Sequence, residues 1–93
     1  MKTKINAILI HDDDNVVTVI TALEKSSTLV IKKGDDIIET VVKEAIPIFH
    51  KVAVRDIKKD APVYKYGQLI GKAISHIERG SHVHDHNIAS PAD

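Results

Sequence analysis

The apolar residues of this chain occur in short runs rich in Val and Ile, and polar turn-forming residues interrupt them about every eight to twelve residues. β-Branched side chains pack well on the pleated surface of a sheet, and regular turns at this spacing are typical of all-β domains. The 93 residues suffice for one domain with a thin core. We therefore expect a compact, mostly β domain.

The expected strands are residues 5–10, 16–20, 28–31, 37–42, 51–54, 63–66 and 72–77. Segments 37–43 and 72–77 are also compatible with short helices, because periodicity cannot decide over so few residues. Residues 32–36 predict a hairpin turn, and Gly67 and Gly71 predict a tight turn at 68–70. We expect the domain to span residues 1–87 and residues 88–93 to form a mobile tail.

Two segments of the chain, residues 15–25 and 50–59, resemble each other. Each is a β-branched run followed by an apolar residue and then by charged residues. This predicts two similar hairpins folded against each other. A chance match between two Val-rich strands explains the pattern nearly as well.

The charge and cysteine content exclude several functional classes. The 13 basic and 13 acidic residues balance without long runs of one sign, which argues against nucleic-acid binding. The absence of Cys excludes disulfides, thiolate nucleophiles and Cys-based zinc sites. The apolar run near the start is too short for a secretory signal or a membrane span. We expect a soluble, cytoplasmic protein.

Three histidines alternate near the end of the chain, at His82, His84 and His86. In a strand their side chains would share one face over roughly 13 Å, whereas a helix would bring only His82 and His86 together. Neutral imidazole ligates mid-to-late first-row cations and transfers protons near neutral pH. The segment is therefore a candidate metal or acid–base site, which His11, His50 or a partner chain would complete. An incidental, solvent-facing terminus is the equally weighted alternative.

Other polar residues are weaker candidates. Lys51 and Arg55 could bind a carboxylate, Arg55 in a bidentate manner, although solvated surface charge explains either residue taken singly. Tyr64 and Tyr66 would share one face of a strand, where part-burial is more common than a ligand contact. His76 stands alone in an apolar run and is expected to pack or lie at a rim rather than to ligate a metal.

Four segments carry a resemblance to a known family through their order and spacing. They are HKVAVRDI at 50–57, VYKYG at 63–67, IGKA at 70–73 and GSHVHDHN at 80–87. Together they resemble the SAF-type domain of the altronate/galactarate dehydratase family, which also includes sulfolactate sulfo-lyase. The chain departs from the family where Gly is usual in three turns, at Phe49, at Asp60 and at Ser26-Ser27. These changes bear on the substrate more than on the fold.

The resemblance implies a β-clip (SAF-like) fold and a module that works beside a larger catalytic subunit. Family members eliminate water or sulfite from a 2-hydroxy acid, commonly with a divalent metal such as Fe²⁺ or Mn²⁺. The expected function is the small subunit of a metal-dependent hydro-lyase acting on a sugar acid, inactive without its large dehydratase subunit. A homo-oligomer is left open.

The same resemblance suggests roles for individual residues. The expected metal ligands are His82, His84 and His86, with His84 and His86 also as catalytic acid–base groups. His82 lies outside the more specific Val-His-x-His-Asn element at 83–87 and gains no support from it. The expected contacts to the substrate carboxylate are His50, Lys51 and Arg55.

Two functions of other classes compete with this one. β-Clip domains also occur as stand-alone carbohydrate-binding or assembly modules, which would favour an aromatic binding face. This chain has no Trp, two Tyr and one Phe, so such a face is not evident. The hypothesis of a metal-carrier protein depends only on the histidines, and it predicts tight metal binding by the isolated chain.

Overall fold

The computed structural model describes residues 5–9 and 11–90, and every regular element within them is a strand. This confirms the expected mostly β domain. The strands are β1 (Ala7–Ile8), β2 (Val16–Thr18), β3 (Thr28–Lys33), β4 (Asp36–Val41), β5 (Lys51–Ala53), β6 (Pro62–Lys65), β7 (Gln68–Ala73), β8 (His82–Val83) and β9 (Ile88–Ala89). No helix in the described part of the chain is long and apolar enough to cross a membrane.

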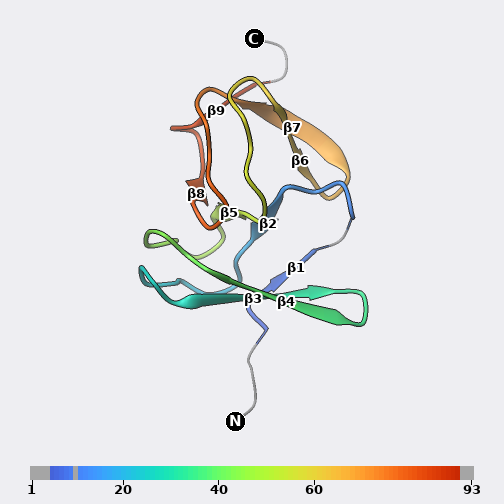
Figure 1. Ribbon diagram of the computed structural model, residues 1–93, viewed down its shortest axis with the longest axis vertical. Helices are drawn as coiled ribbons and strands as arrows, with labels where there is room; N and C mark the ends of the chain where they lie inside the picture. Colours follow the sequence, from blue (N-terminus) through green and yellow to red (C-terminus); the bar gives the residue numbers. More distant parts are fainter. Residues whose placement is uncertain (1–4, 10, 91–93) are drawn as a thin grey trace.

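The strands form three small sheets that follow one another along the long axis of the molecule (Figure 1). At one end β3 and β4 form an antiparallel hairpin, and β1 runs parallel to β3. At the other end β6 and β7 form a second hairpin, and β9 pairs with β7. Between them lies an antiparallel sheet in the order β2-β5-β8. The helical alternative for residues 37–43 is excluded, because β4 occupies most of that segment.

The second hairpin turns earlier than its glycines suggested. Residues 68–70 begin β7 instead of forming the expected tight turn. The turn lies at Tyr66 and Gly67, whose φ angles of 55° and 76° are those of a two-residue type I′ loop. The expected strand at 72–77 is wrong beyond Ala73, where β7 ends.

The end of the described chain also belongs to the fold. Ile88 pairs with Ala73 and Ala89 pairs with Lys72, so these two residues extend the sheet of the second hairpin. The expected mobile tail at 88–93 is therefore wrong for Ile88 and Ala89. Residues 91–93 lie outside the described residues.

One type of turn recurs through the fold. In each copy a buried Leu or Ile is followed by two exposed residues and then by a residue with positive φ, the signature of a type II turn. The buried residues bridge in pairs, Leu23 with Ile46 and Ile57 with Ile77. The positive-φ residues are Ser26 (72°), Phe49 (66°), Asp60 (70°) and Gly80 (90°). Leu23 and Ile57 thus occupy equivalent turns. Segments 15–25 and 50–59 are alike in this respect, although their strands β2 and β5 pair with each other instead of forming two separate hairpins.

The central sheet separates two apolar clusters. Because side chains alternate along a strand, Val17 and Val52 face one side of the sheet and Val16 and Ala53 face the other. The first side packs against residues of β1 and β3, and the second packs against the β6–β7 hairpin. At ~25 cal/mol per Å² of apolar surface removed from water, burial on both sides is the main term that stabilises this sheet.

Candidate functional site

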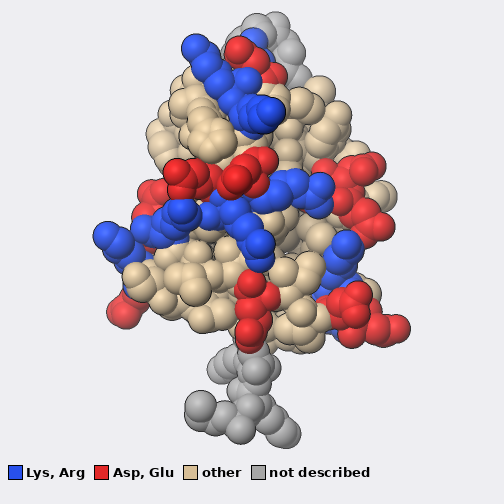
Figure 2. Space-filling model, in the orientation of Figure 1, with Lys and Arg blue, Asp and Glu red and all other residues tan. Residues whose placement is uncertain are grey.

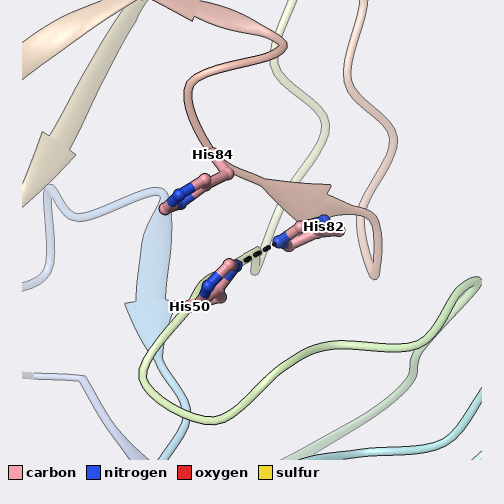
Figure 3. A group of neighbouring side chains, drawn as sticks. All are labelled: His50, His82 and His84. Carbon is pink, nitrogen blue, oxygen red and sulfur yellow. Dashed lines mark hydrogen bonds between the residues drawn. The ribbon is translucent and has the colours of Figure 1, made fainter.

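Strand register brings His50, His82 and His84 together at the edge of the central sheet (Figure 3). Lys51 pairs with Val83 and Val52 pairs with His82 across β5 and β8. Continuing this register by one residue sets His50 opposite His84, while His82 lies on the same face by alternation. We call these three residues the histidine trio. It lies on the sheet face that carries Val52.

The three imidazoles are close enough to act as one group. One ligand nitrogen from each lies within 4.8 Å of the others, and His50 Nδ1 is 2.9 Å from His82 Nε2. The His50 and His84 rings stack with centroids 4.0 Å apart. All three side chains are half-buried. Nδ1 of His84 is fully buried and has no hydrogen-bond partner within the described residues.

A short turn rather than a strand presents His84. Of the strand and helix alternatives for this segment, the strand holds only as far as Val83, and residues 84–87 bend away. The Asn87 side chain clamps this turn, since its Nδ2 donates to His82 O (2.8 Å) and its Oδ1 accepts from His84 N (3.0 Å). His86 is consequently exposed, with its ring tilted against His82 at a centroid distance of 5.1 Å.

The surroundings of His50 and His82 favour neutral imidazoles. Partial burial lowers the pKa of His50, and the nearby His84 and Lys51 lower it further. Partial burial also lowers the pKa of His82, with His86 and His50 adding to the effect. Neutral imidazole is the form that ligates metals and accepts protons, so two of the three rings are held in that form at neutral pH.

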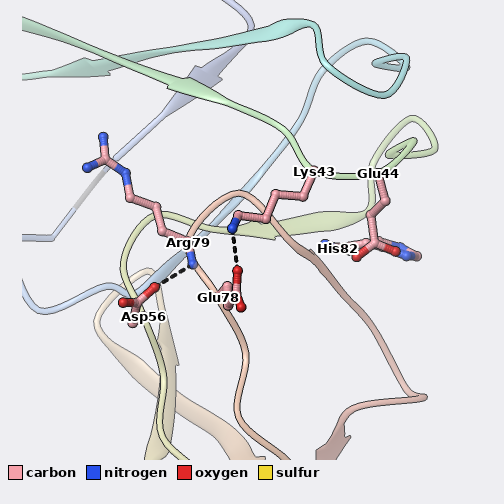
Figure 4. A network of polar contacts seen from close by, with 6 residues as sticks. All are labelled: Lys43, Glu44, Asp56, Glu78, Arg79 and His82. Atoms are coloured by element: carbon pink, nitrogen blue, oxygen red, sulfur yellow. Dashed lines mark hydrogen bonds and ion pairs between the residues drawn. The ribbon is translucent and has the colours of Figure 1, made fainter.

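A polar network supports the chain that leads into β8 (Figure 4). Arg79 donates from its backbone N to Asp56 and from its guanidinium to Thr40 Oγ1 on β4. Lys43 pairs with Glu78. Glu44 accepts from the backbone N of His82 at 3.2 Å and raises the pKa of the His82 ring, against the lowering by burial. These contacts hold the strand of His82 against the end of β4.

The remaining predicted site residues lie elsewhere. Strand alternation places Lys51 on the sheet face opposite His50, half-buried, where burial and then Lys65 lower its pKa. The Arg55 guanidinium donates to the carbonyl of Asp12 at 2.9 Å. His11 rests its ring against Gly67, so it does not complete the trio. His76 is exposed.

The trio is a donor set that fits a divalent first-row cation. Three neutral ring nitrogens are typical ligands for Zn, Fe, Ni or Cu, and the unpaired Nδ1 of His84 is a polar atom that a ligand would satisfy. The predicted ligands were His82, His84 and His86. The structure groups His50, and not His86, with His82 and His84.

The turn that leads into the trio exposes apolar side chains. Ile48 and Phe49, in the turn immediately before His50, are 48% and 69% exposed. Phe49 also has φ 66°, a conformation that costs a bulky residue energy. Elsewhere Lys, Arg, Asp and Glu are interspersed in a mixed band, and neither sign dominates the face seen in Figure 2.

Two supporting residues were not predicted as site residues, Asn87 and Glu44. Asn commonly hydrogen-bonds backbone groups a few residues away, so its position three residues after His84 was the local signal. Glu44 lies 38 residues from His82, and nothing in the local sequence links them.

Comparisons with known proteins show similarity along most of the chain. A family model described as the altronate/galactarate dehydratase SAF domain matches residues 5–91. The (2R)-sulfolactate sulfo-lyase subunit alpha of Chromohalobacter salexigens is 38% identical over 84 residues, covering 86% of this chain and 89% of that protein. Altronate dehydratases of Bacillus subtilis and Escherichia coli are 35% and 37% identical, each covering 86% of this chain but only 15% of the dehydratase. The chain belongs to the altronate/galactarate dehydratase SAF domain family.

Proposed function

We propose that this chain is the small subunit of a metal-dependent hydro-lyase acting on a sugar acid or a related 2-hydroxy acid. The observation that carries the proposal is the histidine trio, in which a half-buried group of imidazoles includes one buried nitrogen without a partner. The relatives support it, because one is a named lyase subunit and the others are dehydratases of which this chain matches 15%. The rest of the active site then comes from a large subunit.

The apolar turn beside the trio supports a partner that covers the site. Exposed aromatic and aliphatic side chains next to a polar cluster are common where one protein docks on another. Ile48 and Phe49 would contact the large subunit, and its docking would exclude water from the trio.

The reaction requires removal of a proton beside a carboxylate and departure of the group on the next carbon. His84 would take or return a proton at the reacting carbons through the ring nitrogen that does not ligate the metal, with His86 at the rim as a second acid–base group. His50 would orient the substrate, while Lys51 and Arg55 would reach a carboxylate only after their side chains rearrange. A bound Fe²⁺ or Mn²⁺ would stabilise the negative charge that builds on the substrate carboxylate.

A co-purification experiment tests the subunit assignment. The tagged chain is recovered from its native extract with divalent metal present, and retained proteins are identified by mass spectrometry. We expect a protein similar to the remaining part of altronate dehydratase, and a complex that converts sugar acids or sulfolactate to 2-keto acids. Repeated recovery of no such protein with a folded bait would contradict the proposal and favour a stand-alone binding module.

Substitution within the recovered complex tests the site. We expect His84→Ala to lower kcat by roughly 100-fold or more, as removal of a general acid–base group does, while the complex still assembles. The matched control is His76→Ala, an exposed histidine outside the trio, which should leave kcat unchanged. Full turnover by the His84→Ala complex would show that His84 has no central role.

A further inference from the structure

We propose that His50, His82 and His84 alone bind one late first-row divalent cation, and that His86 is not a ligand. This concerns the isolated chain, and it refines the ligand set within the proposed function. Its starting point is strand register, which places one ring from β5's leading turn against two from β8 and the turn that follows it (Figure 3).

The spacing of the nitrogens suits a shared ion. Two imidazole nitrogens that ligate one ion at about 2.1 Å lie about 3.0–3.4 Å apart, depending on the coordination geometry. The separation of 2.9 Å between His50 Nδ1 and His82 Nε2 already lies close to this range. The widest separation in the trio, at most 4.8 Å, must shorten by roughly 1.5 Å, and the His84 ring, which stacks on His50, must turn so that its ligand nitrogen faces the ion.

The buried Nδ1 of His84 is the second observation. A buried nitrogen without a hydrogen bond costs free energy, and surrounding residues normally satisfy it. A cation ligated by Nδ1 of His84 would give this nitrogen the partner that it lacks among the described residues.

The donor set defines the class of ion. Imidazole without carboxylate favours Fe²⁺, Co²⁺, Ni²⁺ and Zn²⁺ over Mn²⁺, and it excludes Mg²⁺ and Ca²⁺, which prefer oxygen. Of the two metals that the family resemblance suggests, the trio therefore favours Fe²⁺. Three protein ligands leave positions open for a substrate oxygen.

Metal titration of the purified 93-residue chain tests this site without a partner. Co²⁺ serves as the probe, followed by its visible absorption, with Zn²⁺ and Mg²⁺ as competitors. We expect binding of one Co²⁺ per chain, displacement by Zn²⁺, and no displacement by Mg²⁺. Loss of a supporting contact to a ligand typically weakens metal affinity 10- to 100-fold, so His50→Gln should weaken it by at least about tenfold.

His86→Gln is the matched control variant, because His86 touches His82 but lies outside the trio. It should change Co²⁺ affinity by less than about threefold, and urea unfolding confirms that both variants fold. Equal weakening by His50→Gln and His86→Gln, or no binding by the folded wild-type chain, would overturn the site. Because no activity is measured, failure here leaves the subunit assignment standing, and failure to recover a large subunit leaves the metal site standing.

Discussion

Two equivalent turns lead into the two strands of the histidine site, and they place different residues at the position that requires positive φ. The first, Ile46 to Phe49, precedes His50 and β5, and the second, Ile77 to Gly80, precedes β8. Both need positive φ at their last residue, which Gly adopts without cost and Phe does not. The second turn is thus built for stability, whereas the first keeps a strained, exposed aromatic beside the site. Strain of this kind is typically retained where it serves function.

The largest effect should come from placing a side chain on the relaxed turn. A Cβ at Gly80 would lie 2.6 Å from the carbonyl of Val41, in a conformation that disfavours L-residues. We expect Gly80→Ala to lower the free energy of unfolding by about 2–4 kcal/mol, measured by urea denaturation. Asp60→Ala is the control, because Asp60 already carries a Cβ at φ 70°, and it should cost less than about 1 kcal/mol. Equal losses in the free energy of unfolding for Gly80→Ala and Asp60→Ala would mean that the turn at Gly80 does not depend on glycine more than the turn at Asp60 does.

The two hairpins differ at another pair of equivalent positions, Thr40 and Gly71. A Cβ at Gly71 would lie 2.3 Å from the carbonyl of Ala89, so β9 can approach only because Gly71 has no side chain. We expect Gly71→Ala to displace β9 and cost roughly 1–3 kcal/mol. Hydrogen exchange should show faster exchange at the amide of Ile74, which bonds Asn87 O. Thr40→Ala, which loses two bonds from Arg79, should leave that amide protected.

Relieving the strained turn should stabilise the chain and weaken assembly. Phe49 is 69% exposed, so Phe49→Gly loses little packing and removes the positive-φ cost. We expect a gain of about 0.5–1 kcal/mol in urea unfolding, partly offset by the greater freedom of Gly in the unfolded chain. Affinity for the proposed large subunit should fall. Unchanged affinity would show that Phe49 plays no part in docking, and a loss of stability would show that the turn is not strained.

The smallest effect concerns an ion pair that only the second turn has. Lys43 lowers the pKa of Glu78, whereas the first turn carries Pro47 at the position equivalent to Glu78. A lowered carboxyl pKa stabilises the fold above the ordinary Glu pKa, and this contribution is lost as the pH falls through the lowered value. We expect a slight advantage of wild type over Glu78→Gln in urea at pH 7 that disappears in strong acid. An advantage that persists in acid would assign the effect to packing.

The fold class and most strands could be predicted because their signals are local. Runs of Val and Ile between polar turns identified β2 to β6 to within a few residues, and residues 32–36 identified the first hairpin turn. The second hairpin was misplaced because two glycines competed for the turn. Gly67 has the positive φ, while Gly71 is needed for the close approach of β9, a contact made by a segment 18 residues later.

The candidate site, too, was predicted in part from local sequence, while another part depended on contacts between distant segments. The alternation of His82 and His84 is a property of the chain itself, since a strand places residues i and i+2 on one face. Together with the family resemblance, it was enough to single out that segment from the sequence. The choice of His50 over His86 as the third member depends on which strands pair and in what register. That pairing follows from burial on both faces of the central sheet and from the turn at Asn87, and neither interaction is visible in the spacing of histidines.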